Sequence, residues 1–207
     1  MDTLSQGAEA IIFTDRSVVL KQRVEKSYRH PELDLRLRKF RTRREGKIFS
    51  VLEGVVLIPK LIAYSDKSLV DDKSMTLKMQ YLDGKRVRDV LNSRNISTHC
   101  FNIGKMVAKM HNLNVIHGDL TTSNLIYAKK KIHLIDFGLS FFSKKYEDKA
   151  VDIHLFRQTL LATHPILYEK GYRAFLDSYA TEADEASIIL KRLDEVEHRG
   201  RYKMKEK

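Results

Sequence analysis

The first part of the chain combines short apolar runs with one long stretch of helical spacing. The runs Ala10–Phe13 and Ser17–Lys21 predict two strands separated by a turn. Residues 32–53 predict a long helix, because their apolar side chains can form a stripe with arginines on the other faces. The expected stripe consists of Leu33, Leu37, Phe40, Ile48, Val51 and Leu52.

Two further strands are expected at Val56–Tyr64 and Ser74–Gln80, with a charged loop between them. The pair Asp83–Gly84 breaks the pattern and is the candidate boundary between two lobes. The sequence therefore predicts a β-rich lobe over residues 1–83. It also predicts a mostly helical lobe over 84–198 and a basic tail over 199–207.

The second lobe is predicted to contain helices around one hairpin. The segment TEAD at 181–184 resembles a capping box and would begin the last helix. In the helix that ends at Asn112, the expected shared face consists of Phe101, Gly104, Val107, Ala108 and His111. The hairpin strands are Asn124–Tyr127 and Ile132–Ile135, and the expected helices are 86–92, Thr98–Asn112, Ala150–Thr163, Ile166–Tyr179 and Glu182–His198.

Composition and charge narrow the class of protein. The chain has one cysteine, Cys100, and lacks both a recognisable signal peptide and an apolar run long enough to cross a membrane, so we expect a soluble intracellular protein. The net charge of +11 is concentrated in two places. Residues 21–47 hold eleven basic and four acidic residues, and the tail 199–207 holds five basic and one acidic. Two such patches favour a polyanionic partner, with nucleic acid as the first choice, over a solvated helix face and a disordered tail.

The segment Ile116–Ser140, IHGDLTTSNLIYAKKKIHLIDFGLS, carries the most specific chemistry. Asp119 is followed five residues later by Asn124, and Asp136 lies in an Asp-Phe-Gly context after an apolar run. This layout suits phosphoryl transfer from ATP, in which one carboxylate faces the nucleophile while an amide oxygen and a second carboxylate hold Mg²⁺. Asp119 is the candidate catalytic residue, and Asn124 and Asp136 are the candidate metal ligands.

Upstream residues fit the same chemistry. Lys21 ends an apolar run, where a kinase places its phosphate-binding lysine, and Glu45 on the next helix is the candidate partner that fixes it. Asp152 is the candidate for an aspartate that braces the catalytic loop backbone. His111 and His117 are interpreted as structural, because Mg²⁺ prefers oxygen ligands.

The expected nucleotide pocket has two walls. The segment LSQGAEAII would cover the phosphates, although only Gly7 supplies the freedom of a glycine. Met79 would lie at the back of the adenine pocket, and backbone groups of Gln80 and Leu82 would meet the adenine edge. The candidate ATP-binding residues from both walls are Leu4, Gly7, Ala8, Ala10, Ile12, Lys21, Met79, Gln80 and Leu82.

Two features separate this chain from signalling kinases. Gly118 replaces the arginine that receives a phosphate from the activation loop, so control by activation-loop phosphorylation is not expected. Only 71 residues follow Asp136, and no Ala-Pro-Glu motif follows it, so we expect a truncated helical lobe with little room for peptide docking.

The segments RHPELDLRLRKFRTRRE, HGDLTTSNLI, IDFGLS and EDKAVDIHLFRQTLLATHP closely resemble the PRPK-type small atypical serine/threonine kinases, over nearly the whole chain. These are the kinase subunits of the KEOPS (EKC) complex. The resemblance implies an α+β, bilobal kinase-like fold, ATP and Mg²⁺ as cofactors, and ATP hydrolysis that supports N6-threonylcarbamoyladenosine (t6A) formation at position 37 of tRNA. It also implies serine phosphorylation, including autophosphorylation, and a cytoplasmic or nuclear location.

The resemblance implies that the tRNA-threonylcarbamoyl transferase subunit and other KEOPS subunits are partners. Through the basic patches we expect tRNA to contact the helix at 33–47 and the tail at 199–207. Two alternatives stay open, a free-standing protein serine/threonine kinase and an RNA-binding adaptor with a remnant ATP site. A small-molecule kinase of the aminoglycoside type also uses a His-Gly-Asp loop, but the arginine-rich helix and basic tail argue against it.

Overall fold

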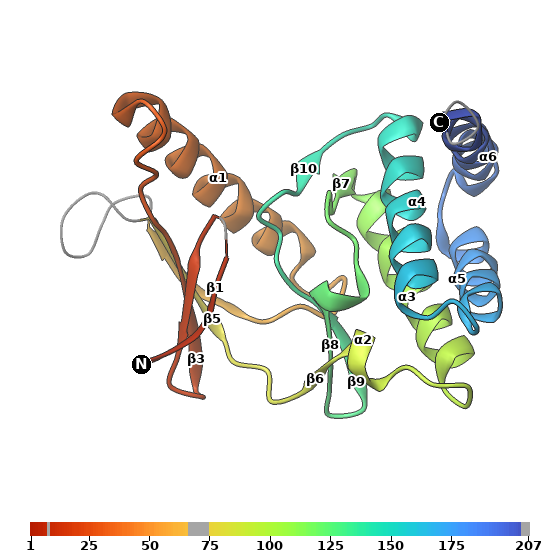
Figure 1. The fold of residues 1–207 in the computed structure, drawn as a ribbon, viewed down its shortest axis with the longest axis horizontal. Coiled ribbons are helices and arrows are strands. Elements are labelled where there is room, and N and C mark those ends of the chain that lie inside the picture. Colours follow the sequence, from red (N-terminus) through yellow and green to blue (C-terminus); the bar gives the residue numbers. More distant parts are fainter. Residues whose placement is uncertain (8, 66–74, 204–207) are drawn as a thin grey trace.

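The computed structural model describes residues 1–7, 9–65 and 75–203, with side chains of the last segment described as far as His198. One lobe is a five-stranded antiparallel sheet with the long helix α1, and the other is mostly helical (Figure 1). The sheet order is β1-β2-β3-β5-β4, and α1 packs on β4 and β5. The elements of this lobe are β1 Asp2–Gln6, β2 Ile11–Thr14, β3 Val18–Arg23, α1 Pro31–Leu52, β4 Leu61–Ser65 and β5 Met75–Gln80.

The second lobe is built around the packing of helix α3 on α5, with α4 and α6 beside them (Figure 1). Three short strands, β6, β8 and β9, form a small sheet that faces the first lobe, and β7 pairs with β10. The elements are β6 Lys85–Arg86, α2 Val87–Val90, α3 Ile96–Asn112, β7 Val115–Ile116, η1 Thr122–Asn124, β8 Leu125–Ala128, β9 Lys131–Leu134, β10 Phe141–Phe142, α4 Tyr146–Thr163, α5 Tyr168–Glu182 and α6 Ala186–Lys203.

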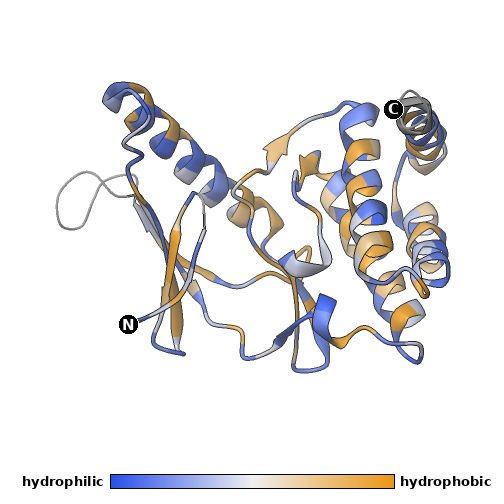
Figure 2. Ribbon diagram, in the orientation of Figure 1, coloured by the Kyte–Doolittle hydropathy of each residue, from blue (hydrophilic) through white to orange (hydrophobic). Residues whose placement is uncertain are grey.

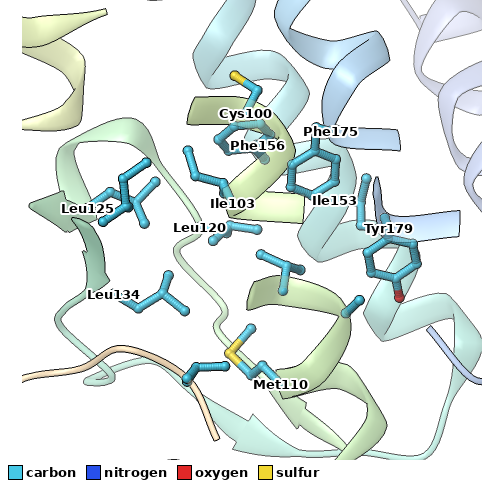
Figure 3. Close-up of a cluster of buried hydrophobic side chains, with 14 of the residues drawn as sticks. Cys100, Ile103, Met110, Leu120, Leu125, Leu134, Ile153, Phe156, Phe175 and Tyr179 are labelled. Atoms are coloured by element: carbon cyan, nitrogen blue, oxygen red, sulfur yellow. The ribbon is translucent and has the colours of Figure 1, made fainter. Parts of the chain in front are cut away.

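The core of the helical lobe is apolar and closely packed. Side chains from α3, α4 and α5 meet beside those of β8 and β9 (Figure 3), and the rings of Phe156 and Phe175 stack at 4.6 Å between centroids. Gly104 lets α3 approach α5, because a Cβ there would lie 2.3 Å from the carbonyl oxygen of Phe175. The helical lobe therefore gives a fixed base to the loops that leave β7, β8 and β9.

Helix α1 differs from the prediction in the face that it buries. Leu33 and Phe40 of the expected stripe are 49% and 58% exposed, whereas Asp34, Arg38, Thr42 and Glu45 are buried. Figure 2 shows hydrophobic and hydrophilic residues mixed along the outer part of this helix, and hydrophobic residues at its inner end. The apolar stripe is confirmed for Ile48 and Leu52, which are fully buried, and for Val51, which is partly buried and packs against the core. Ion pairs explain the difference, because a paired charge can occupy a position that periodicity assigns to an apolar residue.

Gly46 lies inside α1 for a packing reason. A Cβ at this position would lie 2.8 Å from ring atoms of Tyr64 on β4. The glycine therefore lets β4 lie against the helix one residue after Glu45, and it does not mark a break, since α1 runs continuously from Pro31 to Leu52.

Several element boundaries were predicted wrongly. The strand β1 was not predicted, and residues 56–60 lie before β4 instead of within a strand. Thr181 does not begin a helix: it lies in the last turn of α5, where its hydroxyl donates to the Ser178 carbonyl at 2.9 Å, and α6 begins only at Ala186. Phe101 of α3 is 39% exposed, and Cys100 and Ile103 are buried instead.

None of the helices within the described residues is both long and apolar enough to cross a membrane.

Candidate active site

A cleft lies between the five-stranded sheet and the small β6-β8-β9 sheet. Its upper wall comes from β1, β2, β3 and β5, and its floor comes from η1, β8 and the residues after β9. Predicted site residues that line it are Leu4, Ile12, Lys21, Glu45, Met79, Gln80, Leu82, Asn124 and Asp136.

Lys21 is at the centre of the charged end of this cleft. Its Nζ donates to Glu45 Oε1 at 2.8 Å and to Asp136 Oδ1 at 2.7 Å, so the expected pair with Glu45 is present. Burial alone would lower the pKa of Lys21, but the two carboxylates raise it above its ordinary value. Lys21 is therefore a charged ammonium that joins β3, α1 and the segment after β9.

Asp136 is ionised in the same cluster. Burial opposes its ionisation, but the charge of Lys21 prevails and lowers the pKa of Asp136 to about 2. Its backbone has a positive φ of 63°, an unusual conformation for an aspartate, and its side chain is 49% exposed. The carboxylate thus lies at the cleft surface, where it can meet a ligand.

Asp119 is not among the residues that line the cleft, but it is hydrogen-bonded to Asn124, which lies on the floor. The Asn124 amide nitrogen donates to the Asp119 backbone carbonyl at 2.9 Å and to Asp119 Oδ2 at 2.8 Å. Because the nitrogen is the donor in both bonds, the amide oxygen is the atom of Asn124 that could ligate a cation. Together with the carboxylate of Asp136, this oxygen gives the hard donor set that Mg²⁺ prefers. Among the described residues there is no cluster of three or more acidic, histidine or cysteine side chains that could hold a metal ion.

Asp152 braces the loop that carries Asp119, as the sequence predicted. Its carboxylate accepts the backbone N–H of His117 at 2.8 Å and of Gly118 at 2.9 Å. Burial opposes ionisation, yet hydrogen bonding from His111 and the backbone donors keep the pKa of Asp152 below its ordinary value. His111 is held in turn by the Tyr179 hydroxyl at 2.8 Å, a contact that the sequence did not indicate.

His117 and Gly118 shape the loop itself. His117 Nε2 lies 3.2 Å from the Ile135 carbonyl, and the Ser140 hydroxyl donates to the His117 carbonyl at 2.7 Å. Gly118 has a φ of 77°, and a Cβ there would lie 2.7 Å from the Leu139 carbonyl oxygen. A side chain is thus excluded at this position, because the Asp-Phe-Gly segment packs directly on the loop.

Some predicted nucleotide-binding residues do not meet the cleft. Gly7 and Ala10 are not among the lining residues, and Ala8 lies outside the described residues. Gly7 instead donates its backbone N–H to the Ala10 carbonyl at 3.0 Å, which closes the turn between β1 and β2. The backbone N–H of Gln80 is bonded to the Lys60 carbonyl at 2.9 Å, so this donor is already used within the sheet.

Arg23 was missed by sequence reasoning. It lies two residues beyond Lys21 on β3 and therefore on the same face, and its Nη2 donates to Glu45 Oε2 at 2.6 Å. The same strand alternation could have found it. Arg23 does not line the cleft; the lining residues that were missed are Ser5, Val19, Pro59, Tyr81, Gly84, Arg86, Ser123, Ile126 and Ile135.

Known proteins are similar to this chain in sequence. The protein kinase domain family matches residues 10–174. The chain is 35% identical to "KEOPS complex subunit Bud32" of Pyrococcus abyssi, over 98% of this chain and 97% of that protein. It is 36% identical to "Probable serine/threonine-protein kinase BUD32 homolog" of Archaeoglobus fulgidus, over 95% and 94%.

A larger relative is also similar. The chain is 35% identical to "Probable bifunctional tRNA threonylcarbamoyladenosine biosynthesis protein" of Methanosarcina acetivorans, over 97% of this chain but only 36% of that protein. The chain thus spans about a third of the larger protein and nearly all of the two others. It belongs to the protein kinase family, in the group formed by the Bud32 subunits of KEOPS complexes.

Proposed function

We propose that this protein is the ATP–Mg²⁺-dependent kinase and ATPase subunit of a KEOPS assembly, and that it supports t6A formation at position 37 of tRNA. The observation that carries the proposal is that Lys21, Asn124 and Asp136 line one cleft and that Asp119 is hydrogen-bonded to Asn124. The names of two relatives, a KEOPS subunit and a threonylcarbamoyladenosine biosynthesis protein, supply the biological setting.

The catalytic roles follow from charge and geometry. Lys21, fixed by Glu45, holds the phosphates of ATP, and Asp119 orients a water molecule or a seryl hydroxyl and accepts its proton. Asn124 and Asp136 hold Mg²⁺, which supplies neutralisation of the charge on the transferred phosphoryl group.

The apolar part of the cleft suits the adenine ring. Ile12 and Met79 provide apolar walls, and Leu4 covers the opening from β1. Leu82 and the carbonyl of Gln80 take the adenine edge, since the Gln80 N–H is bonded to Lys60. Gly7 and Ala10 serve the turn that precedes β2 and do not form a conventional phosphate-covering loop.

The proposed partners are the tRNA-threonylcarbamoyl transferase subunit, the other KEOPS subunits and tRNA. On α1, Arg36, Arg43 and Lys47 are exposed and suit phosphate contacts, whereas Arg38 is buried against Asp34 and contributes to the lobe instead. The tail 199–207 is a second proposed contact for tRNA. We place the lobe boundary at residues 83 and 84, and the protein in the cytoplasm, with a nuclear pool where the cell has a nucleus.

A second candidate is a protein serine/threonine kinase that also phosphorylates itself, in line with the name of the Archaeoglobus relative. The same residues would serve it, with a seryl or threonyl hydroxyl in place of water. A remnant ATP site is disfavoured, because the charged groups needed for phosphoryl transfer are all present and paired in the cleft.

The test is ATP turnover by wild-type protein and the Asp119→Asn variant, each alone, with the transferase subunit, and with that subunit plus tRNA. We expect Mg²⁺-dependent turnover that rises in the assembly and falls by about 10²- to 10⁴-fold in the variant. Turnover that is independent of Asp119 would contradict the assignment. Phosphate transfer to protein with no response to tRNA would favour the second candidate.

A further inference from the structure

Glu45, the partner of Lys21 in the cleft, also contacts a second buried cation, Arg23. Lys21 and Arg23 project from the same face of β3 toward α1, and both are buried, with 6% and 2% exposure. Lys21 donates to Oε1 of Glu45, and Arg23 donates to Oε2 at 2.6 Å. The carboxylate of Glu45 is therefore held at both oxygens by one strand, whereas the lysine–glutamate pair of a protein kinase needs only one contact.

The two cations that contact Glu45 differ in how close they lie to the ligand side of the cleft. Lys21 is shared with Asp136, whose side chain is half exposed and faces the ligand side. Arg23 is 2% exposed and is not among the residues that line the cleft, whereas Glu45, 1% exposed, lines its charged end. Any change in the bond between Lys21 and Asp136 thus leaves Arg23 in place on Glu45, and α1 keeps its link to β3.

Stability alone does not explain a buried arginine here. Its Nε is buried and makes no hydrogen bond within the described part of the chain. Burying a charge with an unsatisfied donor costs stability, and an apolar side chain of similar size commonly serves stability as well or better. The guanidinium also lies against the Asp-Phe-Gly segment, because a Cβ on Gly138 would be 3.2 Å from Arg23 Nη2 and 3.2 Å from Lys21 Nζ.

The catalytic loop explains why such a second link would be useful. Regulated kinases bring the helix that carries the glutamate into place through phosphorylation of the activation loop. Position 118 cannot carry the arginine that receives such a phosphate, because its φ is 77° and a Cβ would meet Leu139. The helix must therefore be held by other means.

We propose that Arg23 is a positioning residue that holds Glu45, and with it α1, in the catalytically competent place without activation-loop phosphorylation. The proposal rests on the proposed ATP-dependent function of the same cleft. Arg23 acts through Glu45 and Lys21 and does not touch the reacting atoms.

The test compares Arg23→Met with Arg23→Lys and with a matched control, Arg38→Met. Arg38 is also a buried arginine, 5% exposed, and its Nε donates to Asp34 on α1 at 2.6 Å, but it does not contact Glu45. We expect Arg23→Met to lower kcat for ATP turnover by about 10- to 100-fold with a change in KM for ATP below about threefold, because the phosphates are bound but misplaced. Arg23→Lys should recover much of kcat, since it keeps a cation on Oε2, and Arg38→Met should keep kcat even where it lowers the melting temperature.

A second measurement does not depend on turnover. Amide hydrogen exchange of the whole protein with a non-hydrolysable ATP analogue and Mg²⁺ should rise around residues 42–49 in Arg23→Met, and nearer Asp34 in Arg38→Met. Wild-type kcat and unchanged exchange at 42–49 in Arg23→Met would overturn the positioning role. Loss of kcat in both methionine variants in proportion to their melting temperatures would also overturn it. If wild-type protein shows no Asp119-dependent turnover but exchange still rises at 42–49, the positioning role stands and the proposed function fails.

Discussion

The two sides of the cleft are held together by different physics. On the helical side, stacked rings and aliphatic side chains of α3, α4 and α5 pack closely beneath the loop that carries Asp119 (Figure 3). On the sheet side, α1 meets β3 through charges, with Glu45 between Lys21 and Arg23. Packing is non-directional and gives stiffness, whereas paired charges give direction. The molecule therefore places Asp119, the proposed general base, on a stiff apolar platform and Lys21, the proposed phosphate-binding lysine, in a directed ionic frame.

The largest expected effect is a difference in the free energy of unfolding between a variant in the apolar core of the helical lobe and a variant on the surface of α1. Phe175→Ala should lower the free energy of unfolding by about 3–5 kcal/mol, because the ring is fully buried between α3 and α4 partners. Phe40→Ala, at a side chain that is 58% exposed, should cost under about 0.5 kcal/mol. Denaturant unfolding measures both. Equal losses would mean that α1 is packed as the helical lobe is.

A smaller effect is expected where the platform meets the catalytic loop. Asp152→Asn should cost about 1–3 kcal/mol and slow ATP turnover, because an amide cannot accept from both backbone donors while His111 also bonds to it. Asp148→Asn on the same helix, where the carboxylate accepts the Ser143 hydroxyl, is the control and should leave turnover unchanged. A variant Asp152→Asn with normal turnover would show that Asp119 does not depend on this brace.

The exposed surface of α1, on the sheet side of the cleft, can also be tested by substitution. Arg36→Ala and Lys47→Ala, both at exposed positions of α1, should each weaken tRNA binding by the assembled complex and reduce the slope of log K against log salt by about one. Lys130→Ala, in the turn between β8 and β9, is the control and should leave the slope unchanged. If all three variants behave alike, α1 has no special role in tRNA binding.

The smallest effect concerns the pH dependence of stability. Burial opposes ionisation of Asp136, yet Lys21 lowers its pKa from 3.8 to about 2, so the folded state favours the charged carboxylate. This contribution is present above about pH 4 and is lost as pH falls toward 2; solvent screening at a half-exposed group limits it to about 1 kcal/mol. Asp136→Asn should flatten the stability curve between these pH values. Parallel curves for the two proteins would show that Asp136 has an ordinary pKa.

Sequence reasoning succeeded where apolar spacing or a motif carries the signal. The strands β2, β3 and β5, helix α1, the hairpin, the contact of Lys21 with Glu45 and the brace from Asp152 follow from spacing and motif, and the structure contains them. It failed where ion pairing, or a partner on another element, decides which residues are buried. Burial of Asp34 and Arg38 depends on their pairing within α1 and with Arg29, and periodicity assigned the apolar Leu33 and Phe40 to that face instead. The partner of Gly46 is Tyr64 on another element, which no local pattern reveals.

The prediction that residues 7–10 form a loop over the phosphates also failed. Small residues at 7–10 suggested a loop over the phosphates, but Gly7 closes the turn between β1 and β2, and Leu4 and Ser5 of β1 line the cleft instead. A strand with fully exposed residues carries no apolar alternation, so β1 could not be found from its pattern.

The most direct test of the account is t6A formation by a reconstituted complex that contains either wild-type protein or the Asp119→Asn variant. Assembly with the partner subunits and tRNA binding should be the same for both, because Asp119 lies in the cleft loop and its exchange for asparagine leaves the fold unchanged. The account predicts that the variant complex assembles, binds tRNA and yet fails to sustain t6A formation and ATP turnover. Wild-type rates of t6A formation by the variant complex would contradict it.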